Sequence, residues 1–365
     1  MKILCVIDSL GSGGAQRQLV SLAIGFKEKG HEVSVLVYHD EDFFLADLSK
    51  LDIPVSIINE NNYFLRIIKI RSFIRGGKYD GVLSFLEGVN FIVEISSFPF
   101  RKWKLIVGER SSNPNILTSF KLRAYRWFHF FADTVVANSH ENVRIVRECN
   151  PWLGQDKLKV IYNQVDLKKW HYINTTKERK DDQFRLIVIA NHQPLKNALG
   201  LIKAVNLLPD NIKNKLSVHW YGRQDTYEVK EAFLEAKNLL NEYKLESCVR
   251  FFLPNSDIHK IVQNFDALGL FSLYEGLPNT ICEGMASGKP IVASAVSDIP
   301  IFIEEGVNGY LCDPHDLQSI ANALAKVIET PKEMLNEMGI RNRKKAEIMF
   351  SEKETVTSYL NLFEK

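Results

Sequence analysis

The chain has 365 residues, of which 45% are hydrophobic and 25% are charged, and its formal net charge is +2. This length exceeds what one hydrophobic core usually serves, so we expect two domains in an ordinary soluble globular protein. No run of about 18 uninterrupted apolar residues is present, which argues against a membrane-spanning helix. The five cysteines are scattered and form no CxxC pair, which excludes a disulfide scaffold and a cysteine-rich zinc site.

The first residues predict a strand, a glycine-rich turn, a helix and a second strand, at 2–8, 11–14, 15–29 and 33–38. This unit is the usual opening of a doubly wound α/β sheet. Because the strand begins at once, no secretory signal is apparent, and we expect the protein to stay in the cytosol. Further buried strands are expected at 81–85, 105–107, 134–137 and 160–162.

Positive charge is concentrated in the first half of the chain. Residues 62–130 contain 12 Lys and Arg against 4 Asp and Glu, a local balance of 12 − 4 = +8, which predicts a basic region facing an anionic partner. Two segments, 64–75 and 121–131, combine cations and aromatic residues at amphipathic spacing. Such helices could make peripheral contact with a membrane. The alternative is that they are ordinary helices whose apolar sides face the core.

The second half begins after a polar stretch without periodicity, 171–183, which is typical of a linker. Strands and helices then alternate again, with strands expected at 184–190, 216–221, 249–252, 267–271, 291–293 and 309–311 and helices at 198–207, 227–243, 279–286 and 317–328. We therefore predict an α/β protein with two Rossmann-like domains facing a central cleft, covering about 1–170 and 171–345.

The most informative stretch is 273–290, with the sequence LYEGLPNTICEGMASGKP, at the junction of a strand and a helix. In open α/β sheets, ligands bind beyond the carboxyl ends of the strands. Gly276 and Pro278 shape a turn whose free N–H groups meet the positive end of the helix dipole, which suits a phosphate or a sugar hydroxyl. Glu275 and Glu283 are too far apart to share a proton, so we expect each to accept hydrogen bonds from different hydroxyls of one ligand. The alternative is that both carboxylates are simply solvated.

This stretch resembles the Glu-x7-Glu motif of glycosyltransferase family 4, the retaining, group 1 glycosyltransferases of GT-B architecture. The resemblance continues along the chain at 11–16 (GSGGAQ), 136–139 (VANS), 160–166 (VIYNQVD), 305–311 (EGVNGYL) and 350–351 (FS). It implies that Glu283 binds the nucleotide ribose and that Glu275 lies beside the transferred sugar. The residues implied to contact the sugar or diphosphate of the donor are Gly276, Leu277, Pro278, Asn279 and Thr280. The resemblance also implies that a terminal helix at 346–365 returns to the first domain.

Lys196 occupies the position of a lysine in the family pattern, where its ammonium would neutralise the departing nucleoside diphosphate. The position of the family's arginine holds Asn191, which supplies no cation, and this departure weakens the expectation of a second phosphate contact. Arg223, just after the strand at 216–221, is a candidate substitute. The alternatives are that Lys196 caps a loop and that Arg223 is a surface cation.

The glycine-rich turn does not have the spacing of the GxGxxG dinucleotide fingerprint. Gly13 and Gly14 would instead allow a ligand to approach the backbone at a helix start. The resemblance places the acceptor and the donor phosphates at this turn, with Gln16 where many members have Glu. The alternative is a plain tight turn.

Glu109 and Arg110 follow the strand expected at 105–107. The resemblance places Arg110 close to the reacting sugar, where the family often has histidine. Glu109 is not assigned as a nucleophile, because in retaining transfer on this fold the leaving phosphate itself can accept the acceptor's proton. The alternative for these two residues is a structural salt bridge.

The resemblance implies a retaining hexosyltransferase, and we expect it to be metal-independent and without a cofactor, since the histidines are scattered and form no HxxxH pattern. The expected donor is a UDP- or GDP-sugar, and the expected acceptor is a glycan or lipid-linked glycan of surface polysaccharide or lipopolysaccharide synthesis at the inner face of the cytoplasmic membrane. Nucleic-acid binding has no supporting motif. One alternative is a catalytically weakened GT-B partner or binding subunit, which Asn191 motivates. Another is a sugar-nucleotide epimerase or glycan phosphorylase on the same fold.

Overall fold

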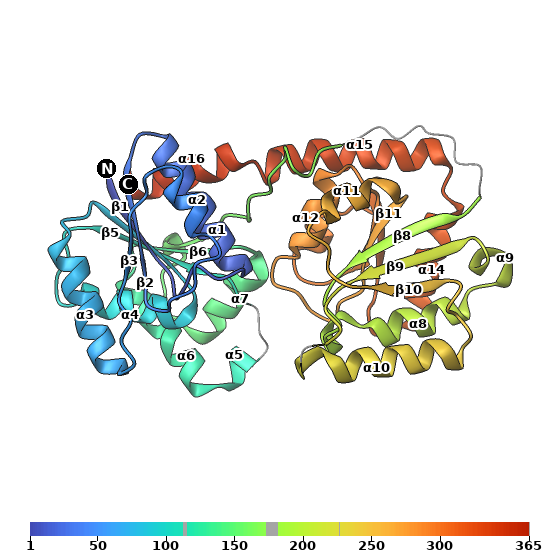
Figure 1. The fold of residues 1–365 in the computed structure, drawn as a ribbon, viewed down its shortest axis with the longest axis horizontal. Coiled ribbons are helices and arrows are strands. Elements are labelled where there is room, and N and C mark those ends of the chain that lie inside the picture. The colour runs from blue at the N-terminus through green and yellow to red at the C-terminus, as the bar shows by residue number, and fades with distance from the viewer. Residues whose placement is uncertain (112–114, 173–181, 226, 365) are drawn as a thin grey trace. The chain divides into compact units, whose positions relative to one another are not determined.

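The computed structural model describes residues 1–111, 115–172, 182–225 and 227–364. The chain divides into two compact units (Figure 1), which we call unit 1 (Met1–Gln164 with Glu352–Lys365) and unit 2 (Val165–Ser351). The divisions fall after residues 164 and 351, against the expected 170 and 345. The second division is later than expected because helix α15 (Lys332–Met349) belongs to unit 2 over its whole length. Most of the linker expected at 171–183 lies outside the described residues.

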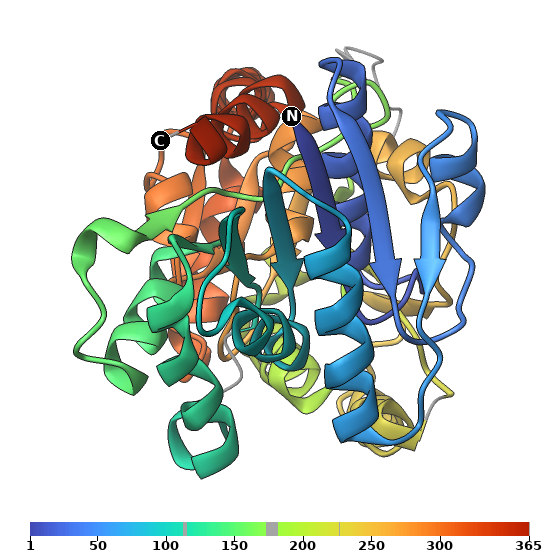
Figure 2. The same cartoon turned by 90° about the vertical axis from the view of Figure 1, so that its left-hand side faces the viewer.

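Unit 1 is built on a seven-stranded parallel sheet with the strand order β3-β2-β1-β4-β5-β6-β7. The strands are β1 (Lys2–Val6), β2 (Glu32–Val37), β3 (Val55–Ile57), β4 (Gly81–Phe85), β5 (Lys104–Glu109), β6 (Thr134–Ala137) and β7 (Leu158–Val160). The helices are α1 (Gly14–Glu28), α2 (Leu45–Ser49), α3 (Tyr63–Gly76), α4 (Glu87–Ser97), α5 (Asn115–Thr118), α6 (Phe120–Trp127), η1 (Phe128–Phe131), α7 (His140–Cys149), η2 (Gln155–Lys157) and α16 (Glu352–Glu364). Figure 2 shows helices on both faces of this sheet, which explains why β4 and β6 are buried along their whole length.

The last helix of the chain completes the core of unit 1. The ring of Phe363 on α16 lies 6.2 Å from the ring of Phe26 on α1, and both residues belong to the core on one face of the sheet. Helices α3 and α4 contribute Ile70 and Ile92 to the separate core on the other face. The first strand and the last helix thus pack in the same unit, and Figure 1 shows both termini there.

Unit 2 is a six-stranded parallel sheet with the order β10-β9-β8-β11-β12-β13. Its strands are β8 (Phe184–Ile189), β9 (Leu216–Tyr221), β10 (Val249–Phe252), β11 (Ala267–Leu270), β12 (Ile291–Ser294) and β13 (Gly309–Cys312). Its helices, besides α15, are η3 (Pro194–Lys196), α8 (Ala198–Leu207), α9 (Asp210–Lys213), α10 (Tyr227–Glu242), α11 (Ile258–Ile261), η4 (Val262–Asn264), α12 (Asn279–Ala286), α13 (Ile299–Phe302) and α14 (Leu317–Glu329).

Each sheet has one position at which the strand order reverses, between β1 and β4 in unit 1 and between β8 and β11 in unit 2. Ligands of open α/β sheets bind at such switch points, beyond the carboxyl ends of the two strands. The glycine-rich turn follows β1. The segments that contain Lys196 and Glu275 follow β8 and β11. The topology therefore puts the predicted acceptor and donor residues at the two positions where ligands are expected.

Candidate active site

In unit 2, the segment after β8 packs against the segment after β11. The backbone N–H of Leu273 donates to the carbonyl of Leu195 at 2.8 Å. The hydroxyl of Thr280, in the first turn of α12, donates to the carbonyl of Ile189 at 3.1 Å. Because these contacts join both ends of the two segments, side chains far apart in the sequence lie at one edge of the sheet.

Lys196 and Glu275 form an ion pair at this edge. The ammonium Nζ lies 2.6 Å from Oε1 of Glu275, and the hydroxyl of Ser272 donates to the same oxygen at 2.6 Å. The two charged side chains are 19% and 10% exposed, so both are largely desolvated and still reachable. An ammonium has three N–H donors, and Glu275 takes one of them. Lys196 can therefore donate to a phosphate with its remaining N–H groups. Glu275, held in place by Lys196 and Ser272, can accept hydrogen bonds from sugar hydroxyls.

Helix α12 begins at Asn279, as the sequence predicts, so Glu275 lies in the preceding turn and Glu283 lies inside the helix. The N-cap residue of α12, Pro278, makes no side-chain cap hydrogen bond, and the hydroxyl of Ser297 donates to the carbonyl of Gly276 at 2.5 Å and fixes the turn. The positive end of the helix dipole therefore faces the end of the turn. Glu283 is 9% exposed.

Asn191 and Arg223 lie side by side. The backbone N–H of Arg223 donates to Oδ1 of Asn191 at 3.1 Å. The loops after β8 and β9 approach so closely that a Cβ at Gly222 would collide with the carbonyl oxygen of Ala190. An exposed arginine therefore stands next to the position where the family's cation is missing.

His192, which sequence reasoning missed, anchors the segment after β8. It is 1% exposed, and its ring lies within 5.3 Å of the rings of Trp220, Phe233 and Phe251. Burial lowers the pKa of His192 to about 4, so the imidazole is neutral and packs as an aromatic ring in the core. No signal in the sequence separates this histidine from a polar loop residue.

In unit 1, the side chain of Gln16 covers the glycine-rich turn that was predicted to border the acceptor. Gly13 is the N-cap of α1 with φ of −75°, so this position does not require the backbone freedom of glycine. The amide Nε2 of Gln16 donates to Oδ1 of Asp8 at 2.9 Å, and the Gln16 side chain covers Gly13. Gly14 is the first residue of α1. Gln16 is thus held at the end of β1, at the switch point.

Arg110 and Glu109 do not pair with each other, and each has other structural partners. The guanidinium of Arg110 donates to Oδ1 of Asn163 at 2.6 Å and to the hydroxyl of Tyr359 on α16, and it lies 3.9 Å above the ring of Phe85. Glu109 is the last residue of β5, whereas from the sequence we expected it to follow a strand ending at residue 107. Arg110 therefore ties α16 to the sheet.

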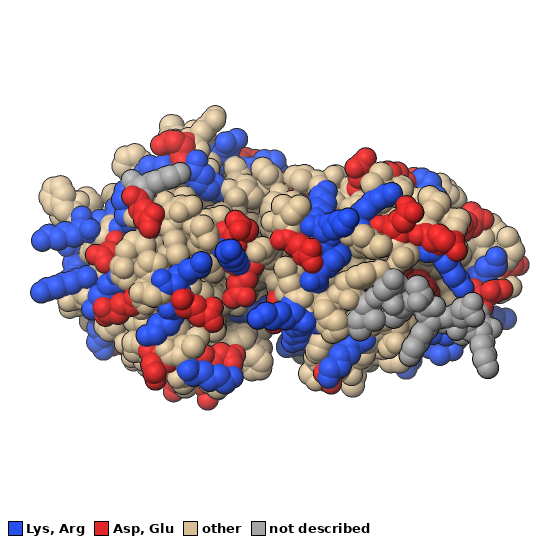
Figure 3. Space-filling model, turned by 90° about the horizontal axis from the view of Figure 1, so that it is seen from above, with Lys and Arg blue, Asp and Glu red and all other residues tan. Residues whose placement is uncertain are grey.

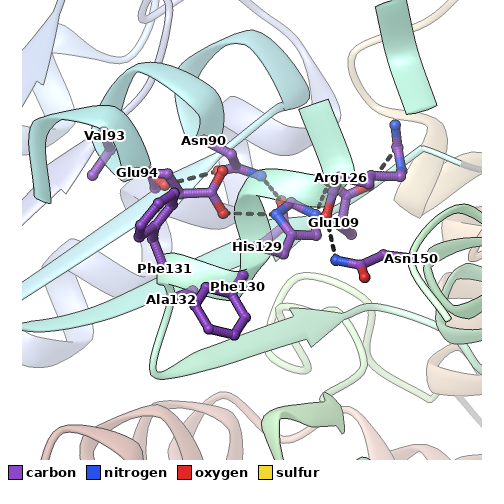
Figure 4. A network of polar contacts seen from close by, with 12 residues as sticks. Asn90, Val93, Glu94, Glu109, Arg126, His129, Phe130, Phe131, Ala132 and Asn150 are labelled. Carbon is purple, nitrogen blue, oxygen red and sulfur yellow. Dashed lines mark hydrogen bonds and ion pairs between the residues drawn. The ribbon is translucent and has the colours of Figure 1, made fainter. Parts of the chain in front are cut away.

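Glu109 belongs instead to a buried network of charges with Glu94, Arg126 and His129 (Figure 4). His129 lies between two carboxylates, with Nδ1 2.7 Å from Glu94 and Nε2 3.1 Å from Glu109. Nη2 of Arg126 donates to the other oxygen of Glu109 at 2.5 Å. All four residues are at most 2% exposed. One hint in the sequence is Glu94, a carboxylate in the apolar run of α4, but the run does not show which residues it pairs with.

The network shifts the pKa values of its members, and at Glu94 burial outweighs the effect of His129 and raises the pKa of the carboxyl group. Burial lowers the pKa of His129, but Glu94 and Glu109 outweigh that effect and raise it to about 9. Burial raises the pKa of Glu109, but Arg126 and His129 outweigh it and hold the pKa below its ordinary value. His129 is therefore an imidazolium, and Glu109 is a carboxylate, at neutral pH.

The predicted basic surface of the first half is smaller than the sequence suggests. Arg126 is fully buried, so 121–131 is not a cationic membrane-facing helix along its whole length. Arg71 and Arg75 donate to carbonyl oxygens at the C-terminal end of α4, including that of Ser96. On the face shown in Figure 3, Lys and Arg are interspersed with Asp and Glu. Several of these cations form hydrogen bonds within unit 1 and stabilise the fold, so they are not all available to an anionic partner.

Among the described residues, no group of three or more His, Cys, Asp or Glu side chains is arranged to hold a metal ion. In the same part of the chain, no helix combines the length and apolar character needed to cross a bilayer.

Two α/β units, each with a parallel sheet and with candidate ligand-binding loops at its switch point, define the GT-B class of fold. A solved structure of Anabaena Alr3699/HepE in complex with UDP superimposes with a TM-score of 0.86 at 22% identity and covers 100% of both chains. Two family models match nearly the whole sequence, Glycosyltransferase Family 4 over residues 12–169 and Glycosyl transferases group 1 over residues 173–345. The chain therefore belongs to the group 1 glycosyltransferases of family 4.

Two curated relatives share part of this sequence. The N-acetyl-alpha-D-glucosaminyl L-malate synthase of Bacillus anthracis is 23% identical over 64% of this chain and 59% of its own length. The UDP-Gal:alpha-D-GlcNAc-diphosphoundecaprenol alpha-1,3-galactosyltransferase of Escherichia coli is 26% identical over 60% of this chain and 58% of its own length. The matches thus span less than two thirds of either relative.

Proposed function

We propose that this glycosyltransferase moves a sugar from a UDP- or GDP-sugar to a glycan or lipid-linked glycan, with retention of anomeric configuration. The observation that carries the proposal is the ion pair of Lys196 and Glu275 at the switch point of unit 2. The UDP bound to the Anabaena protein and the UDP-Gal named as donor of the Escherichia coli relative favour a uridine nucleotide. The diphosphoundecaprenol acceptor of that relative favours a lipid-linked glycan in surface polysaccharide synthesis.

The chemistry follows from where charge develops. As the bond from the anomeric carbon to the diphosphate breaks, its electron pair stays on the phosphate oxygen, and Lys196 and the N-terminus of α12 stabilise that charge. Glu275 would orient the hydroxyls of the transferred sugar, and Glu283 would accept hydrogen bonds from the ribose diol. The phosphate oxygen takes the proton of the acceptor hydroxyl while the hydroxyl oxygen bonds to the same face of the sugar. This route retains configuration without an enzymic nucleophile.

We also propose that the reaction needs neither a metal ion nor a cofactor. In many transfers of this kind, the negative charge of a diphosphate must be neutralised as it leaves. Lys196 supplies one positive charge, Arg223 stands beside Asn191 to supply a second, and the α12 terminus adds a partial charge.

The test is a panel of UDP- and GDP-sugars, each mixed with octyl glycosides of common hexoses and followed by nuclear magnetic resonance without added metal. We expect an α-linked product from an α-linked donor. A β-linked product would contradict retention, and an epimerised donor without transfer would favour the epimerase alternative. A protein that binds donors but transfers to no glycoside would favour the partner-subunit alternative that Asn191 motivates.

The acceptor proposal includes docking on an anionic membrane, through three exposed phenylalanines of unit 1 that we call the phenylalanine patch: Phe98, Phe100 and Phe130. They are 57%, 83% and 68% exposed. The ring of Phe131 lies 6.0 Å from both Phe98 and Phe130, so the patch is continuous at this point.

Two cations that also donate to backbone carbonyls of this region, Arg75 and Lys157, lie at the patch. Arg75 donates to the carbonyls of Phe98 and Phe100 at 2.8 and 2.9 Å, and the ammonium of Lys157 lies 5.3 Å from the Phe130 ring. Exposed phenyl rings enter the headgroup region of a bilayer while neighbouring cations meet lipid phosphates. Such docking would hold the enzyme at the inner face of the cytoplasmic membrane, where lipid-linked acceptors are found.

A further inference from the structure

Glu87 stands at the switch point of the unit 1 sheet, where the proposed function requires an acceptor. Val6 of β1 pairs with Ser84 of β4, so Asp8 and Leu86, each two residues further on, leave the sheet side by side. Leu86 has φ of 79°, a left-handed value that a leucine adopts only where the surrounding structure enforces it. Glu87 then begins α4, with its direction set by this turn.

The surroundings of Glu87 leave room for a ligand. A Cβ added at the next residue, Gly88, would meet no atom within 4 Å. The Glu87 side chain is 23% exposed, and its Oε1 lies 3.4 Å from Nη2 of Arg126, a long contact. Among the described residues, Oε2 of Glu87 has no hydrogen-bond partner. A partly exposed carboxylate thus lies beside a backbone position with open space.

The buried network keeps this carboxylate in place. Nη1 of Arg126 donates to the carbonyl of Leu122 at 2.9 Å, and Nη2 donates to Glu109, which His129 holds in turn. Arg126, Glu109, His129 and Glu94 are buried, whereas Glu87, at the end of the row, reaches the surface. A buried row of charges rarely improves stability over a well-packed apolar core. In this protein, the row of charges holds the guanidinium of Arg126 in a fixed position next to Glu87.

We propose that Glu87 binds the sugar ring of the acceptor through hydrogen bonds that ring hydroxyls donate to its carboxylate, and that Arg126 is the positioning residue behind it. This inference rests on the proposed glycosyl transfer and names the acceptor site on unit 1. An ionised carboxylate only accepts hydrogen bonds and has room for several, which suits a polyol. Gln16, held at the end of the neighbouring strand β1, borders the same switch point.

The experiment measures steady-state transfer to whichever octyl glycoside the wild type uses in the panel above. In Glu87→Gln, the acceptor KM is expected to rise about tenfold or more, since hydrogen bonds to a charged group are the stronger kind. The donor KM and the slow hydrolysis of donor without acceptor should stay at the wild-type values. Glu87→Asp, which keeps the charge, should recover part of the acceptor affinity.

Glu148→Gln is the matched control, because Glu148 is also a helical glutamate paired with an arginine, at the surface of α7. It should leave every constant unchanged. An acceptor KM in Glu87→Gln within twofold of wild type would overturn the inference, as would an equal loss of donor hydrolysis. If the wild type transfers to no glycoside, the proposed function itself fails. If the wild type transfers and the Glu87→Gln acceptor KM is unchanged, this inference alone fails.

Discussion

His129 couples the folding of unit 1 to pH. Its pKa is raised from 6.5 to about 9 in the folded protein, because Glu94 and Glu109 outweigh the effect of burial. The folded state therefore binds a proton more tightly than the unfolded state. The resulting stability is fully present below pH 6.5, decreases as the pH rises and is lost above about pH 9.

We predict that urea unfolding of the wild type shows a free energy that falls by about 3 kcal/mol between pH 6.5 and pH 9.5, since each pKa unit corresponds to about 1.4 kcal/mol. His129→Gln should lose most of this decrease and should be less stable than wild type mainly at low pH. Parallel curves for wild type and variant would show that His129 does not carry the dependence.

The contact between Lys196 and Glu275 could be predicted from the sequence in outline, whereas the network around His129 could not. Lys196 and Glu275 each follow a buried apolar strand, and parallel strands bring their carboxyl ends to one edge. Arg126 and His129 have the helical spacing of an amphipathic surface segment. Their partners come from β5 and α4, and only tertiary packing shows that they face inward.

At the scale of elements, the phenylalanine patch lies on the loop after α4 and on η1. We predict that replacing Phe98, Phe100 and Phe130 together by serine reduces co-sedimentation with vesicles of phosphatidylglycerol several-fold. The physical reason is the loss of apolar area that enters the interface. Wild-type binding should also weaken with added salt and be poor on phosphatidylcholine alone, because the cations need anionic lipid.

The matched control for this patch replaces three other exposed apolar residues, Phe43, Trp152 and Leu253, which are 65%, 79% and 61% exposed. It should bind vesicles as the wild type does. Equal loss in both triple variants would mean that general surface hydrophobicity, and not this patch, causes the association.

Elements whose apolar residues recur at the spacing of a strand or a helix were predicted closely, as β9 and α12 show. Strand β3 was missed because its three residues are only partly buried or exposed, which leaves little pattern to read. Strand β5 was predicted too short, since the buried carboxylate of Glu109 interrupts the apolar run that marks a strand. Both errors arise where the pattern of polarity and the pattern of burial differ.

At the scale of the whole molecule, the chain forms two α/β units and then returns to the first. Helix α16 places Tyr359 and Phe363 in the core of unit 1, and Tyr359 accepts a hydrogen bond from Arg110. Local sequence shows an amphipathic end but not the unit on which it packs. Only the family resemblance led us to expect the return.

The central claim is that the edge of unit 2 at Lys196 and Glu275 holds the diphosphate of a nucleotide sugar. Titration calorimetry of UDP and GDP against wild type, Lys196→Ala and the surface control Lys203→Ala tests it most directly. We predict that one nucleotide binds the wild type and Lys203→Ala equally and binds Lys196→Ala at least about tenfold more weakly, since a charge-assisted contact to phosphate is lost. Equal affinity for all three proteins, or no affinity of the wild type for either nucleotide, would contradict the account.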